Sequence, residues 1–175
     1  MLEYFKSQAE IAYGDLLESI RDLDELGSWS RLTPREGDYL HSDGSIIGQV
    51  THVAGCKVLY GSAAFHSMET RLKEITERTI AIGTDWEEAK AYLEECQAYW
   101  LSSWSGLHDD ALDDLAPTNW GDEWPIWKIL NCVMGHDHYH AGQIALTRAV
   151  ALPADSPPPP LNEEEIAFLK TFKAW

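Results

Sequence analysis

Apolar residues in this chain recur at intervals of three and four over long segments, the spacing that places them on one face of an α-helix. The first segment carries such a stripe at Phe5, Ala9, Ala12, Leu16, Ile20 and Leu23. Gly27 is its expected end, because glycine commonly follows a helix. No segment shows a convincing strand pattern. The chain is therefore expected to be all-α.

The rest of the chain predicts more helices. We expect a second helix over 45–66, a short one within 67–84, a third long helix over 85–107 and a last one over 124–152. The second is apolar on most sides and rich in small residues, which suits a central helix. Asp85 is a suitable N-cap, and Pro125 is tolerated in a first turn. Residues 1–152 thus predict a four-helix bundle.

The composition changes after residue 152. Pro157 to Pro160 form four consecutive prolines, which favour a stiff extended spacer. The segment beyond them predicts a short helix capped by Asn162, with several apolar residues on it. We therefore expect residues 153–175 to be a C-terminal appendage that docks on the bundle or on a partner chain.

The charge balance excludes several classes of partner. Thirteen Lys and Arg residues stand against 29 Asp and Glu residues, which gives a net charge of −16. Such a chain repels nucleic acid and anionic membrane surfaces. No apolar run reaches the roughly 18–20 residues of a membrane span, and the N-terminus lacks the features of a signal peptide. Three cysteines are too few for a disulfide framework, so a cytoplasmic protein is expected.

Histidines mark the candidate site. His136 and His140 are four residues apart in the last predicted helix, so both point from one face and can bind a single metal ion. Gln143 lies on the same side, where its amide could orient an imidazole or a bound water. His138 lies on the opposite face. His52, inside the apolar second helix, is a candidate third ligand, although one histidine there can also be an ordinary core residue.

The chain resembles the DinB/YfiT-like superfamily of metalloenzymes over most of residues 1–150. The resemblance is carried by HDHYHAGQ in the last helix, with its His-x-x-x-His followed by Gly-Gln, and by QVTHVAGCKVLY in the second. It implies an up-down-down-up four-helix bundle, often a homodimer. It also implies one divalent metal, commonly nickel or zinc, held by His52, His136 and His140.

The resemblance implies two kinds of function. The superfamily includes proteins similar to thiol-dependent S-transferases and to a thiol-dependent isomerase, so the chain is expected to be a metal-dependent enzyme that uses a low-molecular-weight thiol and a small-molecule substrate. Metal-dependent hydrolysis is the rival within the same class. The alternative is a non-catalytic metal-binding or stress-response protein whose bundle serves dimerisation.

Cysteines and tryptophans lie near the predicted ligands. Cys56 follows His52 by one turn, and Cys132 precedes His136 by one turn. We interpret both as small buried residues, with contact between Cys56 and the metal as the alternative. Core anchoring is the simplest role for tryptophans 100, 104, 124 and 127. Trp120 and Trp124 precede the ligand helix, where they could also line a pocket above the metal.

Overall fold

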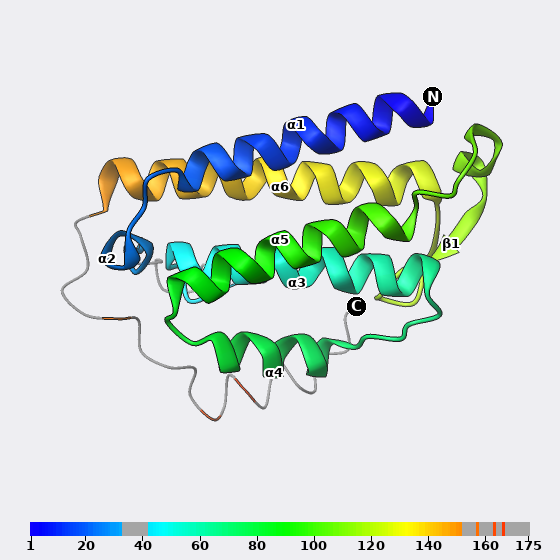
Figure 1. Cartoon of the computed structure of the whole chain (residues 1–175). Coiled ribbons are helices and arrows are strands. Elements are labelled where there is room, and N and C mark those ends of the chain that lie inside the picture. The colour runs from blue at the N-terminus through cyan, green and yellow to red at the C-terminus, as the bar shows by residue number, and fades with distance from the viewer. Residues whose placement is uncertain (33–41, 152–156, 158–162, 164–165, 167–175) are drawn as a thin grey trace.

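The computed structural model describes residues 1–32, 42–151, 157, 163 and 166. Its four long helices form a bundle, which confirms the predicted all-α fold (Figure 1). They are α1 (Leu2–Ile20), α3 (Ile46–Phe65), α5 (Trp86–Ser103) and α6 (Ile126–Val150). Most of the appendage expected at 153–175, Asn162 included, lies outside the described residues.

The helix directions follow an up-down-down-up pattern. In Figure 1, α1 and α6 run in one direction and α3 and α5 run in the other. The parallel pair α3 and α5 is joined through the shorter helix α4 (Leu72–Ile82), which returns the chain to the end where α3 began. α3 packs against α4, α5 and α6, whereas α1 packs chiefly on α6.

Local signals in the sequence explain where the helices begin. Ser45 caps α3, its hydroxyl accepting a hydrogen bond from the Gly48 backbone N–H at 3.0 Å. Asp85 caps α5 in the same way, accepting from Glu88 N–H at 3.0 Å, as its sequence position predicts. Pro125 stands just before α6, one position earlier than expected.

Apolar side chains from all four long helices fill the interior. Ala12, Leu16, Val50, Leu93 and Ile144 are at most 1% exposed. Among the tryptophans, Trp100 and Trp104 are buried as predicted. Trp127 is 41% exposed, so its interpretation as a core anchor was wrong: one residue beyond the buried Ile126, it faces about 100° away from the core.

Two further elements differ from the sequence expectation. The first helix ends at Ile20 instead of Gly27, because Asp22 takes a left-handed φ of 60° and interrupts it before α2 (Glu25–Ser28). A 3₁₀ turn, η1 (Asp109–Asp113), leads to strands β1 (Leu115–Pro117) and β2 (Glu123–Pro125), which pair antiparallel. This hairpin was not predicted, since three-residue strands ending in proline are too short to show alternation.

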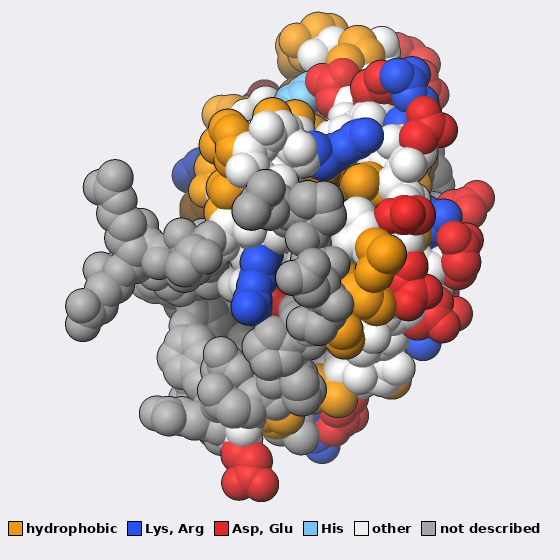
Figure 2. Space-filling model, turned by 90° about the vertical axis from the view of Figure 1, so that its left-hand side faces the viewer, with side chains coloured by type: hydrophobic (Ala, Val, Ile, Leu, Met, Phe, Trp, Pro, Cys, Tyr) orange, Lys and Arg blue, Asp and Glu red, His pale blue; other side chains and the backbone are white. Residues whose placement is uncertain are grey.

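The surface reflects the acidic composition. Figure 2 shows acidic side chains gathered along one side of the end of the bundle where α1 and α6 finish. None of the helices among the described residues is both long and apolar enough to cross a membrane.

Candidate metal centre

Helices α3 and α6 carry the candidate ligands. His52 and Cys56 lie one turn apart on α3, and His136 and His140 lie one turn apart on α6. The two helices pack against each other in opposite directions (Figure 1). Residues 84 positions apart in sequence, His52 and His136, are therefore neighbours in space.

The three histidines predicted from the sequence come together. The Nε2 atom of His136 lies 3.2 Å from Nε2 of His52 and 3.1 Å from Nε2 of His140. The ring centroids of His52 are 5.0 Å from those of both partners, and the other pair is 4.4 Å apart. His140 is buried, whereas His52 and His136 are half-buried. The ring nitrogens of His52 and His140 thus both lie close to Nε2 of His136, where the two helices meet.

A sulfur atom adjoins the imidazoles. Sγ of Cys56 lies 3.7 Å from Nε2 and 3.9 Å from Nδ1 of His52. One ligand atom from each of His52, Cys56 and His136 lies within 4.8 Å of the others, so this group could hold a metal ion. Imidazole and thiolate ligands suit zinc and related divalent metals. The group shares His52 and His136 with the ligands expected from the sequence, and His140 adjoins it through Nε2 of His136, 3.1 Å away.

Burial sets the acid–base properties of this cysteine. It raises the pKa of the Cys56 thiol to about 12, and the nearby Lys57 ammonium opposes the rise. Without a bound cation the side chain is thus a neutral thiol at pH 7 and a weak nucleophile. A coordinated divalent ion reverses this preference, because metal-bound thiols are deprotonated.

A buried ion pair lies beside the candidate ligands and was not foreseen. Lys57 on α3 pairs with Oδ2 of Asp137 on α6, and both side chains are at most 3% exposed. Burial lowers the pKa of Lys57 and raises that of Asp137, and the charge of each partner opposes the shift of the other. The sequence did contain a signal for this pair. Lys57 lies in an otherwise apolar helix and Asp137 lies between the ligand histidines, so each charge needed a buried partner.

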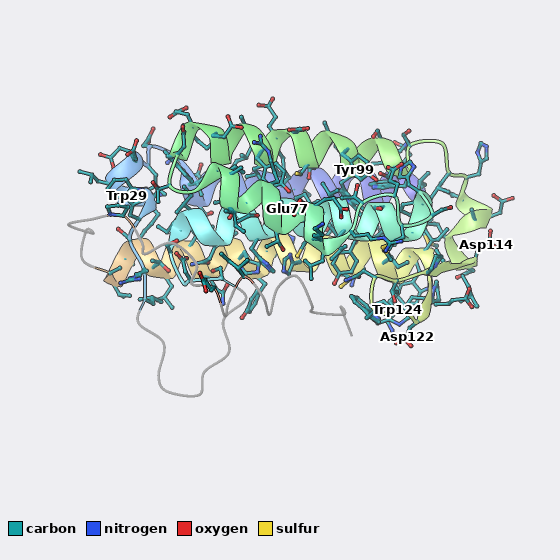
Figure 3. The ribbon with its side chains drawn as sticks, turned by 90° about the horizontal axis from the view of Figure 1, so that it is seen from below. Trp29, Glu77, Tyr99, Asp114, Asp122 and Trp124 are labelled. Carbon is teal, nitrogen blue, oxygen red and sulfur yellow. The ribbon has the colours of Figure 1, made fainter. Side chains whose placement is uncertain are left out.

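Two residues predicted near the metal make other contacts. The Gln143 amide donates to the Tyr139 hydroxyl at 2.8 Å, so its predicted action on an imidazole stays a prediction. Trp124 lies at the hairpin end, near Asp122 (Figure 3). It stacks edge-on against Trp120 with centroids 4.8 Å apart. Trp124 lies in β2, and at 1.5 Å per residue α6 rises about 15 Å from Ile126 to His136, so the structure does not bring Trp124 to the histidines.

His138 behaves as its position predicts. Its Nδ1 lies 3.0 Å from a carboxylate oxygen of Asp15 on α1, and its side chain is 44% exposed. It therefore points away from the three clustered histidines.

A cavity of about 310 Å³ lies between α1 and α5. Its lining consists of Tyr13, Leu17, Ile20, Lys90, Leu93 and Glu94, and so contains no candidate ligand.

Comparison with known proteins gives one match. The family model of the DinB superfamily matches residues 12–144, more than half of the chain, and this span includes α3 and all four candidate ligands. No curated protein and no solved structure gave a significant match. The match, the predicted and observed four-helix bundle and the clustered histidines agree with one another. The chain belongs to the DinB superfamily.

Proposed function

We propose that the protein binds one divalent metal ion, zinc or nickel, through His52, His136 and His140. The observation that carries this proposal is the convergence of three Nε2 atoms, separated by 3.2 and 3.1 Å around His136. Imidazole nitrogen is a preferred ligand of both metals. Membership in the DinB superfamily supports the same assignment.

As the activity, we propose metal-dependent transfer of a low-molecular-weight thiol to a small electrophilic substrate, or a related isomerisation. This proposal rests on the family resemblance. A bound ion lowers the pKa of a thiol and holds it as a thiolate. The chain's own contribution is to fix three imidazoles between α3 and α6, with His52 and His136 half-buried and so within reach of solvent. A homodimer is the proposed assembly, and metal-dependent hydrolysis is the rival reaction.

A second candidate is a non-catalytic metal-binding bundle in a stress response. One observation favours it: Sγ of Cys56 lies 3.7 Å from Nε2 of His52. A cysteine ligand beside three histidines would give a four-coordinate site, which is typical of structural zinc.

Metal content tests the binding proposal. Purified protein is incubated with zinc or nickel, desalted and measured by plasma mass spectrometry. The expected result is one metal ion per chain, lost in His140→Ala because a ligand is removed. His138→Ala is the matched control, since His138 lies on the same helix but contacts Asp15. A metal-free wild type would contradict the proposal, and full occupancy in His140→Ala would contradict the ligand assignment.

Turnover then separates the two candidate functions. Metal-loaded protein is mixed with small thiols and electrophiles, and the loss of free thiol is followed with time. An enzyme consumes thiol in the wild type and in His138→Ala, but not in His140→Ala. A metal-loaded wild type that consumes neither thiol nor electrophile would favour the non-catalytic bundle.

A further inference from the structure

We propose that Cys56 is a fourth protein ligand, so that His52, His136, His140 and Cys56 form a tetrahedral site of three imidazoles and one thiolate. This inference rests on the metal site proposed above and adds a ligand to it. Cys56 stands one turn after His52 on α3, half-buried like that histidine. A helical i, i+4 pair can serve one metal ion from a single face.

Three of the six edges of such a tetrahedral site can be compared with separations in the structure. With metal–nitrogen bonds of 2.0–2.1 Å and a metal–sulfur bond of 2.3 Å, such a site has N···N edges of about 3.3 Å and N···S edges of about 3.6 Å. The structure gives N···N separations of 3.2 and 3.1 Å around His136, and 3.7 Å between Sγ of Cys56 and Nε2 of His52.

A fourth edge of the site, from Cys56 to His136, is also within reach. Ligand atoms of His52, Cys56 and His136 all lie within 4.8 Å of one another. The sulfur therefore needs only a small side-chain rotation to approach His136 as closely as it approaches His52.

The other cysteines are placed differently. Sγ of Cys132 lies 3.7 Å from the Tyr60 hydroxyl oxygen, one turn before His136 on α6. Cys96 is buried on α5 within the main hydrophobic core. Among the described residues, Cys56 is the cysteine whose sulfur lies within 4.8 Å of ligand atoms of both His52 and His136. The chain thus offers two natural controls for a role of the Cys56 sulfur.

Ligation by Cys56 has a chemical consequence for the proposed function. The S–H bond is replaced by an S–metal bond and the proton passes to water, with no oxidation or reduction. Four protein ligands complete a four-coordinate site, which is typical of structural zinc, whereas catalytic zinc keeps an open position. A small thiol would then have to displace Cys56 or add as a fifth ligand.

Cobalt spectroscopy tests this ligand directly. Cobalt(II) is added to the full chain, and the absorption spectrum is recorded for the wild type, Cys56→Ser, Cys132→Ser and Cys96→Ser. A thiolate ligand gives a near-ultraviolet charge-transfer band that histidine ligands do not give. The expected result is a band in the wild type and both control variants that is lost in Cys56→Ser, while the visible bands of bound cobalt remain.

Other outcomes overturn the inference in distinguishable ways. Visible cobalt bands without the charge-transfer band remove Cys56 from the site but leave the proposed metal binding intact. Failure of the wild type to bind cobalt at all overturns both. Loss of the band in Cys132→Ser alone would assign the sulfur to Cys132.

X-ray absorption of the zinc-loaded wild type keeps the test independent of whether Cys56→Ser folds. One sulfur at about 2.3 Å with three nitrogens at about 2.0 Å is expected. A shell of nitrogen and oxygen alone would contradict the inference.

Discussion

Lys57 and Asp137 each follow a candidate ligand in sequence, Cys56 and His136, and pair across the interface of α3 and α6. Removing two charges from water costs several kcal/mol per ion, which is regained only when each charge keeps its partner. Oδ1 of Asp137 is also buried, with no hydrogen-bond partner among the described residues. At the scale of single residues, this pair links the two ligand-bearing helices directly beside the candidate ligands.

Removing one half of this pair is expected to destabilise the protein strongly. Lys57→Met leaves the Asp137 carboxyl buried without its countercharge, and breaking a buried pair in this way typically costs about 3–5 kcal/mol. The free energy of unfolding, measured by urea denaturation with and without the substitution, checks the value.

The double variant Lys57→Met with Asp137→Leu is the control. Replacing both charges by apolar groups of similar size is often neutral, so most of the lost stability should return. A loss below about 1 kcal/mol for Lys57→Met alone would mean that water reaches the pair, since exposed pairs contribute that little.

At the scale of elements, α4 packs closely against α3 at Gly55, which has no side chain. A Cβ atom placed on Gly55 would lie 2.4 Å from Cγ2 of Ile75, which is itself buried on α4. The two helices therefore approach more closely than any larger residue would permit.

Gly55→Ala is accordingly expected to lower the free energy of unfolding by about 1–3 kcal/mol, the usual cost of overpacking a core. Gly14→Ala is the matched control, because Gly14 lies inside α1 with no atom within 4 Å of the added carbon. There alanine should stabilise the helix by about 0.5–1 kcal/mol. Equal effects of the two substitutions in thermal or urea unfolding would contradict the packing argument.

The elements also show what the sequence could predict. Apolar spacing located the long helices: α1 buries one stripe, whereas the central α3 is buried on most sides. The caps Ser45 and Asp85 marked two of the helix starts. The spacing of His136 and His140 placed both on one face, since helix geometry is local. Pairing of Lys57 with Asp137 is not local: it depends on how α3 crosses α6, which periodicity leaves open.

Cys56 and Trp124 lie at different distances from the candidate ligands, although the sequence placed both near them. Cys56 follows the predicted ligand His52 by four residues, and Trp124 stands just before the helix that carries His136 and His140. One helical turn keeps Cys56 beside His52, whereas Trp124 lies in β2, before the stretch of α6 that leads to His136.

At the scale of the whole molecule, the proposed metal would join helices from distant parts of the chain. A ligand that binds only the folded state adds about 2.7 kcal/mol at a concentration 100 times its dissociation constant. For a domain of this size, 1 kcal/mol raises the melting temperature by about 2–4 °C. Zinc should therefore raise it by roughly 5–10 °C, and a chelator should reverse the change. An equal rise in His140→Ala would show that zinc acts elsewhere.

Because α1 packs chiefly on α6, it lacks its main packing partner for much of the time that the chain is being synthesised. About 130 residues separate the end of α1 from the end of the helix on which it chiefly packs. At 5–20 residues per second, a ribosome needs about 7–26 s to synthesise that stretch. During this time the apolar stripe of α1, with Phe5, Ala12 and Leu16, lacks its main partner on the nascent chain. α1 is thus made well before α6 but gains its main packing partner only when α6 emerges, so its apolar stripe stays open to unwanted contacts for that time.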